Sequence, residues 1–178
     1  MIHLLTVSGS LRAGSSNVAL LAAAVRLAPE GVNVAPFTGI AEMPAFSPDV
    51  DVEPAPESVV AWRMALANAD GVVLSSPEYA HGMPGALKNA LDWVVGSGEL
   101  YGKPVALLNP SPESLFAHPQ LAEVLRTMGA EVVEPASITV RVPRGGASVE
   151  RIVDDADIAH AVQGALTAFV GAIASRQS

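Results

Sequence analysis

The sequence contains no cysteine, few aromatic residues and few charged residues. Of its 178 residues, aromatic side chains make up 4% and charged side chains 16%, whereas half are hydrophobic. The absence of cysteine excludes disulfide bonds, thiol nucleophiles and cysteine-ligated metals, and it fits a reducing compartment. The four histidines are scattered without metal-ligand spacing, so we expect no metal site. The core is expected to be aliphatic, as in parallel sheets covered on both faces.

Basic residues are also scarce. Ten lysines and arginines oppose 18 aspartates and glutamates, which gives a formal net charge of -8. Since nucleic-acid binding depends on clustered lysine and arginine, we expect no nucleic-acid partner. No apolar run approaches the roughly 20 residues that span a bilayer, and no signal-peptide pattern is present. The sequence therefore predicts a cytoplasmic protein without membrane association.

Strand-like apolar runs alternate with helical patterns along the chain. Strands are predicted at residues 2–7, 32–37, 71–75 and 105–108, with a fifth inside 131–142. Helices are predicted at 18–27, 56–69, 84–94, 119–128 and 155–174, the first of them capped by Ser16 or Asn17. A proline-rich excursion at 43–54, a glycine-bearing loop at 143–148 and a frayed C-terminal tail complete the prediction. This alternation and length favour one α/β domain, residues 1–178, with a parallel sheet.

The loop after the first predicted strand has the composition of a phosphate-binding loop. It reads Gly9-Ser10-Leu11-Arg12-Ala13-Gly14-Ser15-Ser16-Asn17. Small residues let backbone N–H groups at a helix N-terminus approach an anion, Arg12 adds a fixed positive charge, and Ser10, Ser15 and Asn17 add side-chain donors. The spacing fits neither Gly-x-Gly-x-x-Gly nor a P-loop, so ATP hydrolysis is not expected. A plain polar turn with a helix cap is the alternative interpretation.

The loop after the third predicted strand is typical of a site for a flat ligand. It reads Ser76-Pro77-Glu78-Tyr79-Ala80-His81-Gly82-Met83-Pro84-Gly85. Its prolines and glycines restrict the backbone, whose N–H groups can bond the rim of a planar heterocycle. Tyr79 offers a ring and His81 a donor, although half-buried packing of the tyrosine and simple solvation of the histidine are the alternatives. In a parallel sheet both loops lie at the carboxyl edge, where ligands bind.

No side-chain set for catalysis is recognisable in this sequence. There is no carboxylate pair and no Ser-His-Asp arrangement, so the chemistry has to come from a cofactor.

Together these residues resemble the NADPH-dependent FMN reductase family, which includes quinone, azo-dye and chromate reductases. Two motifs carry the resemblance, which extends from Ile2 to about Gly129: Gly9-Ser10-Leu11-Arg12-x-x-Ser15-x-Asn17 and Pro77-Glu78-Tyr79-x-x-Gly82-x-Pro84-Gly85-x-Leu87-Lys88-Asn89-Ala90-Leu91-Asp92-Trp93. The resemblance implies a flavodoxin-like, doubly wound, five-stranded parallel sheet of order 2-1-3-4-5. It also implies FMN as cofactor, NADPH or NADH as reductant, and a homodimer or dimer of dimers with residues 88–93 at the interface.

The same resemblance assigns the site residues. The FMN phosphate would be held by Ser10, Arg12, Ser15, Ser16 and Asn17. The isoalloxazine ring would be contacted by Pro77, Glu78, Tyr79, Ala80, His81 and Gly82, with Ser111 on a third loop after the fourth strand. Hydride would pass from the nicotinamide to FMN and then to a quinone-like, azo, flavin or metal-oxyanion acceptor by a ping-pong mechanism, without a catalytic side chain.

The chain departs from the family pattern at two places. Ala80 and His81 stand where relatives commonly have asparagine after the tyrosine, and the third loop reads Asn109-Pro110-Ser111-Pro112-Glu113-Ser114 instead of a glycine-rich sequence. Two other functions stay open at this point. One is a flavodoxin-like electron carrier, and the other is a flavin-free binding protein that retains the fold.

Overall fold

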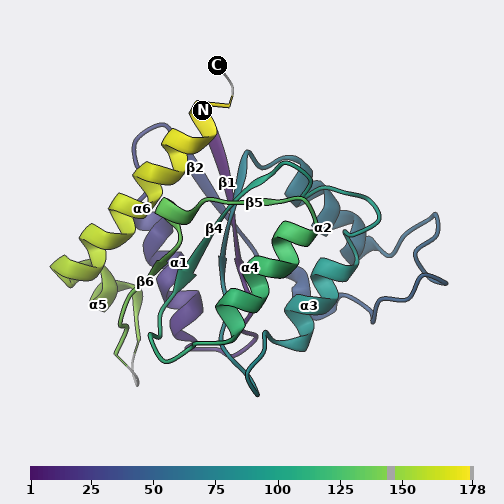
Figure 1. Cartoon of the computed structure of the whole chain (residues 1–178), viewed down its shortest axis with the longest axis horizontal. Helices are drawn as coiled ribbons and strands as arrows, with labels where there is room; N and C mark the ends of the chain where they lie inside the picture. Colours follow the sequence, from purple (N-terminus) through teal and green to yellow (C-terminus); the bar gives the residue numbers. More distant parts are fainter. Residues whose placement is uncertain (144–146, 177–178) are drawn as a thin grey trace.

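The computed structural model describes residues 1–143 and 147–176. Its centre is a parallel β-sheet with helices on both faces (Figure 1). The strands are β1 (Ile2–Ser8), β2 (Val32–Phe37), β3 (Gly71–Ser75), β4 (Pro104–Asn109), β5 (Glu131–Val132) and β6 (Ile138–Thr139). They lie in the order β2-β1-β3-β4-β5, with β6 also paired to β4. The expected strand order 2-1-3-4-5 and the parallel α/β architecture are confirmed.

The fifth strand position differs from the prediction. Instead of one strand inside residues 131–142, β5 and β6 flank a 3-10 helix, η2 (Glu134–Ala136), and both pair in parallel with β4. Pro135 lies in this turn, and a proline has no N–H to donate to a sheet ladder. The edge is therefore built from two short pieces joined by a tight turn.

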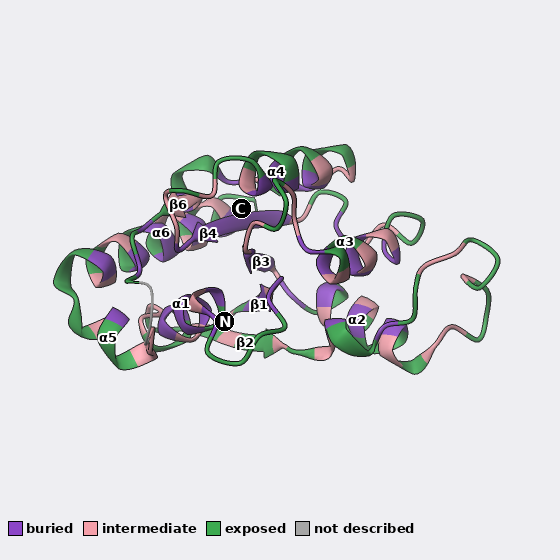
Figure 2. Ribbon diagram, turned by 90° about the horizontal axis from the view of Figure 1, so that it is seen from below, coloured by how far each residue is buried: buried purple, intermediate pink, exposed green. Residues whose placement is uncertain are grey.

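In the described part of the chain, six α-helices cover the two faces of the sheet, as Figure 2 shows along the strand direction. They are α1 (Ser16–Arg26), α2 (Glu57–Ala67), α3 (Gly85–Asp92), α4 (Ala117–Thr127), α5 (Val149–Asp154) and α6 (Ala156–Ala174). Successive side chains of a strand point to opposite faces. Leu4 accordingly packs with α1, α5 and α6, whereas Leu5 packs with α2, α3 and α4.

Two helix predictions need correction. Ser15, and not Ser16 or Asn17, caps α1, because its backbone is extended and its hydroxyl accepts the N–H of Asn17. Helix α5 was not predicted; Ser148 caps it, and it covers only six residues. The predicted loop at 143–148 and the C-terminal tail lie partly outside the described residues.

Helix α6 is longer and more apolar than the short apolar runs expected from the sequence. By length and composition alone, its 19 residues are apolar enough to cross a membrane. In the fold, however, its apolar side lies on the sheet, where Val162, Leu166 and Phe169 are fully buried among residues of β1, β3 and β4. The helix thus serves as a core element of the α/β layer.

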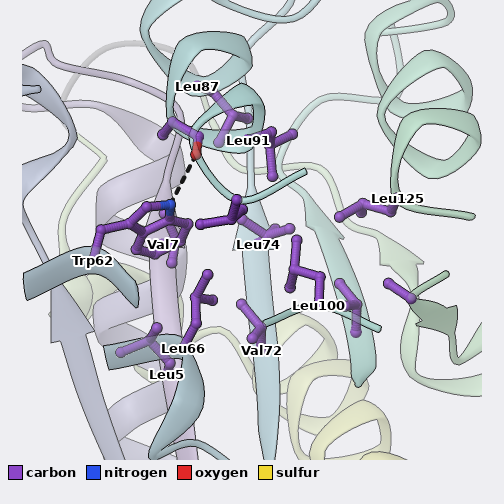
Figure 3. Packing of buried hydrophobic residues seen from close by; sticks show 14 of the residues in the cluster. Leu5, Val7, Trp62, Leu66, Val72, Leu74, Leu87, Leu91, Leu100 and Leu125 are labelled. Carbon is purple, nitrogen blue, oxygen red and sulfur yellow. Dashed lines mark hydrogen bonds between the residues drawn. The ribbon is translucent and has the colours of Figure 1, made fainter. Parts of the chain in front are cut away.

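The core between the sheet and helices α2 and α3 contains the buried Trp62 (Figure 3). Its indole is buried among leucine and valine side chains, and its Nε1 donates to the Ala90 carbonyl at 2.8 Å. A buried indole N–H needs such an acceptor. This bond fixes α3 against α2, and α3 begins where the loop after β3 ends.

The excursion at 43–54 is irregular, as predicted, but it is tied to α3 and α2. Asn89 receives the Phe46 N–H and donates to the Pro44 carbonyl, and Trp93 Nε1 donates to the same carbonyl at 2.8 Å. On α2, Arg63 donates to Asp51 and to the Trp93 carbonyl. Two residues of the family-like motif thus hold a segment of their own chain.

The Trp62 bond leads to a stability prediction. Trp62→Phe keeps most of the apolar volume but leaves the buried Ala90 carbonyl without the indole donor. We expect a loss of about 1–3 kcal/mol in the free energy of unfolding. Urea denaturation measures it, with Met64→Leu on the exposed side of α2 as the control. Equal unfolding midpoints for both variants would contradict a structural role for the bond.

Candidate functional site

Three loops leave the sheet side by side at its carboxyl edge, the lower edge in Figure 1. We name them the first loop (residues 9–15, after β1), the second loop (76–84, after β3) and the third loop (110–116, after β4). Because β1, β3 and β4 are neighbours in a parallel sheet, the loops adjoin one another. A Cβ on Gly9 would lie 2.8 Å from the Ser76 hydroxyl, so the first and second loops approach as closely as glycine permits.

The first and third loops form two walls of a cleft of about 580 Å³. Arg12, Gly14 and Ser16 line one wall, and Pro110 and Ser111 line another. Gly14 has φ +72, a backbone conformation that glycine adopts without strain. Helix α1 begins at this wall, so its unpaired N–H groups and positive dipole end face the cleft region. This arrangement suits an anionic group.

The other predicted phosphate ligands lie deeper. Ser10, Ser15 and Asn17 are buried, and Asn17 accepts the Ser75 hydroxyl at 2.9 Å while its own N–H is accepted by Ser15. These bonds connect the first loop to the end of β3. Direct donation from these side chains to a phosphate stays a prediction, whereas their effect on the loop's shape is visible in the structure.

The second loop contains a two-residue hairpin. Tyr79 and Gly82 exchange both backbone hydrogen bonds, at 2.9 and 3.0 Å, and the two residues between them have positive φ, 50 for Ala80 and 62 for His81. Positive φ at both central positions defines a type I′ turn, in which asparagine and glycine are favoured. Tyr79 is 55% exposed at the base of this turn. The departure from the family's asparagine therefore leaves the tight turn in place.

Glu78 joins the second loop to the third. One of its carboxylate oxygens accepts the N–H groups of Phe116 (2.7 Å) and Ala117 (2.9 Å) and the hydroxyl of Ser114 (3.3 Å). It therefore caps the N-terminus of α4. The backbone N–H groups of Ala117 and Phe116 hold the pKa of this carboxyl below its usual value. The Glu78 side chain is directed toward α4. It therefore positions the backbone of residues 77–78, which is available to a ligand.

Two further contacts support the same junction. The His81 and Phe116 rings stack with centroids 4.1 Å apart, and the Gln120 side chain accepts the Met83 N–H at 3.0 Å. Nearby, burial lowers the pKa of His118, the second residue of α4. The second loop is thus held against α4 at several points.

Side-chain hydrogen bonds hold the third loop, which lacks the glycines of the family pattern. The Asn109 side chain accepts the Ser111 N–H at 3.0 Å, and the Ser111 hydroxyl donates to Glu113 at 2.9 Å. Glu113 also accepts from Arg141, which lies beyond β6. Hydrogen bonds to Arg141 and Ser111 lower the pKa of Glu113 to about 2.

The structure sorts the predicted site residues into three groups. Arg12, Ser16 and Ser111 line the same cleft, Ser10, Ser15 and Asn17 are buried, and residues 77–82 belong to the adjoining second loop. Within the described part of the chain, no group of three or more histidine, aspartate or glutamate side chains is placed to hold a metal.

Sequence reasoning missed four residues around the site: Glu113, Phe116, Gln120 and Arg141. The proximity of Arg141 to the carboxyl end of the last predicted strand was the available signal, since that edge carries the ligands of parallel sheets.

The Glu78 cap leads to a prediction about pH. The lowered pKa means that the ionised cap stabilises the fold above pH 4.5, the ordinary value, and that this contribution disappears as the pH falls through the folded-state pKa. The stability difference between the wild type and Glu78→Gln should therefore be full at neutral pH and shrink in acid. Urea unfolding from pH 7 to pH 3 measures this, with Glu123→Gln in the middle of α4 as control. A difference independent of pH would contradict the capping role.

Comparisons with known proteins agree with this geometry. The family model for NADPH-dependent FMN reductase matches residues 2–142. The NAD(P)H-dependent FMN reductase of Pseudomonas aeruginosa is 38% identical over 112 residues, or 62% of this chain and 60% of that enzyme. The quinone reductase of Escherichia coli is 37% identical over 113 residues, with the same coverage of both chains. The match thus spans about 60% of the length of these relatives.

Similarity of structure extends over almost the entire chain. FerB, a flavoenzyme NAD(P)H:(acceptor) oxidoreductase from Paracoccus denitrificans, superimposes with a TM-score of 0.77 at 25% identity, covering 98% of each chain. The flavodoxin-like fold expected from the sequence is therefore confirmed. The two loop motifs, the strand order and the match over residues 2–142 lead to one conclusion: the chain belongs to the NADPH-dependent FMN reductase family.

Proposed function

We propose that this chain is an FMN-dependent oxidoreductase that uses NADPH or NADH to reduce a small-molecule acceptor. The acceptor would be a quinone, an azo compound, a flavin or a metal oxyanion. One observation carries the proposal: Arg12 and Ser16 line a cleft at the α1 N-terminus, directly beside the loop that presents Tyr79 at the end of the neighbouring strand. Family membership and the names of the relatives support the same chemistry.

The first loop fits the phosphate of FMN. Arg12 supplies a fixed guanidinium charge, and Ser16 begins α1, whose free N–H groups point toward an anion at this position. Ser10, Ser15 and Asn17 are buried, and the Asn17 N–H donates to the Ser15 hydroxyl, which helps to hold the loop in shape. On a chain with net charge -8, such local donors have to provide the affinity.

The second and third loops fit the flat part of the flavin. The backbone from Pro77 to Gly82 is fixed by the type I′ turn and by the Glu78 cap, so its N–H groups keep their direction without a ligand. Tyr79 and His81 are exposed on the second loop and would contact this part of the flavin, with Ser111 lining the cleft from the third loop. When bound, FMN would supply the hydride and electron transfer itself, so this chain's residues bind and orient the reactants and none acts as a catalytic acid or base.

A single open face beside Tyr79 would serve reductant and acceptor in turn, which corresponds to a ping-pong mechanism. We further propose that residues 1–178 form one flavin-binding domain in the cytoplasm, in keeping with the lack of cysteine. Assembly as a homodimer or dimer of dimers is proposed from the family-like motif at 88–93. In that motif Lys88 is exposed on α3, whereas Asn89 and Trp93 are engaged with the excursion.

The absorption spectrum of the purified protein tests the proposed function. After FMN is added and excess flavin removed, we expect a bound-flavin spectrum that bleaches when NADPH or NADH is added without oxygen. Addition of a benzoquinone should restore the colour and consume further reductant. A bound flavin that neither reductant bleaches would identify an electron carrier instead. A protein that retains no flavin would identify a flavin-free binding protein.

Arg12 provides a sharper test of the phosphate assignment. Arg12→Ala removes the charged donor of the first loop, so we expect the dissociation constant for FMN to rise by about tenfold or more. Affinity for riboflavin, which lacks the phosphate, should change little, and turnover at saturating FMN should be retained. Quenching of flavin fluorescence measures both affinities, with Arg26→Ala at the other end of α1 as control. Equal losses for FMN and riboflavin would place the Arg12 contact elsewhere on the flavin.

A further inference from the structure

The cleft at the first loop has a wall that the family motifs do not include. Besides Arg12 and Ser16, it is lined by Arg141, Val142, Pro143 and Ala147, which follow β6 in the chain. This segment is placed by the sheet, because Val140 N–H donates to the Asn109 carbonyl at 2.8 Å and Val142 N–H donates to the Pro110 carbonyl at 3.1 Å. Residues 140–142 thus continue the β6 register alongside the third loop.

The direction of Arg141 follows from this register. Val140 and Val142 are buried in the core shared with α6, whereas Arg141 between them is exposed. Alternate residues of an extended chain point to opposite sides. The arginine therefore points away from the core and lines the cleft.

The electrostatics of the cleft favour an anion with more than one negative charge. Among its described lining residues, Arg12 and Arg141 carry positive charge and Glu113 carries negative charge. The Arg141–Glu113 pair has side chains 69% and 46% exposed. Water screens a pair this exposed, so a ligand can take the place of Glu113 even though the pair lowers the pKa of that carboxyl. A phosphate dianion offers the same guanidinium two parallel hydrogen bonds and a larger charge.

We propose that Arg141 is a second phosphate-binding residue, which exchanges Glu113 for the phosphate monoester of a ligand in this cleft. Glu113 then acts as the resident competitor, keeping the guanidinium in place beside Ser111 until the ligand binds. Two ligands of the proposed reaction carry such a group, FMN at its 5′ position and NADPH at its 2′ position. The inference thus deepens the proposed function, because it names what selects a phosphorylated flavin or nicotinamide nucleotide.

Calorimetric titration with inorganic phosphate tests the site without reference to any flavin. We expect Arg141→Ala to weaken phosphate binding by about tenfold. Glu113→Gln, which removes the competing charge, should strengthen binding severalfold. The matched control is Arg126→Ala, which removes an exposed arginine paired with Glu134 outside this cleft. Unchanged phosphate affinity in Arg141→Ala, or weaker binding in Glu113→Gln, would overturn the proposal.

Nucleotide titrations then identify the source of the phosphate. A loss for FMN but not for riboflavin in Arg141→Ala supports contact with the flavin phosphate. A loss for NADPH but not for NADH, measured on the FMN-loaded protein, supports contact with the 2′-phosphate. The proposal would be overturned if Arg141→Ala lost as much affinity for riboflavin as for FMN and as much for NADH as for NADPH. If the wild-type protein binds phosphate through Arg141 but retains no FMN, the proposed function fails while this site stands.

Discussion

The geometry of the candidate site depends on one interaction, the capping of α4 by the Glu78 carboxylate. The sheet ladder ends at Ser8, Ser75 and Asn109, so the loops beyond lack strand pairing with one another. Glu78 replaces it by accepting the backbone N–H groups of Phe116 and Ala117 at the start of α4, 38 and 39 residues later in the chain. With the Gly9 approach to Ser76, it makes the three loops adjoining parts of one surface. A ligand then meets donors whose directions are already fixed, which lowers the entropy lost on binding.

The third loop is held in shape by other interactions than the Glu78 cap. Pro110 and Pro112 restrict the backbone, and the Asn109 side chain imitates a turn by accepting the Ser111 N–H. Glycine-rich loops adapt to a ligand by backbone freedom, whereas this loop is shaped in advance. The wall at the end of β4 is therefore formed without glycine.

The sequence predicts the fold well wherever the signal is local. β2 and β3 match their predicted bounds because apolar β-branched runs are bounded by turn residues, and the first loop is found because a parallel strand end faces the ligand edge. The cap of α1 was misplaced by one residue, since neighbouring serines differ only in backbone conformation. The split of β5 and β6 depends on Pro135 within a register that β4 imposes.

The site itself is less predictable because its decisive contacts are distant in sequence. Nothing around Glu78 shows that its carboxylate reaches α4 and not a ligand. The stacking of His81 on Phe116 likewise depends on how two loops meet. Arg141 lies among residues whose alternation becomes meaningful only when the pairing of residue 139 with Asn109 is known. A shift of the register by one residue would direct its side chain into the core.

The charge distribution explains how an acidic chain can bind phosphorylated ligands. The net charge of -8 repels anions at long range, but at physiological salt this field is screened over about 8 Å. Within the cleft, affinity depends on the guanidinium groups and helix N–H groups that touch the ligand. The acidic surface therefore reduces the capture rate of every anion, while the cleft favours those whose phosphate reaches both walls. An uncharged molecule experiences neither effect, so the charge distribution discriminates only among anions.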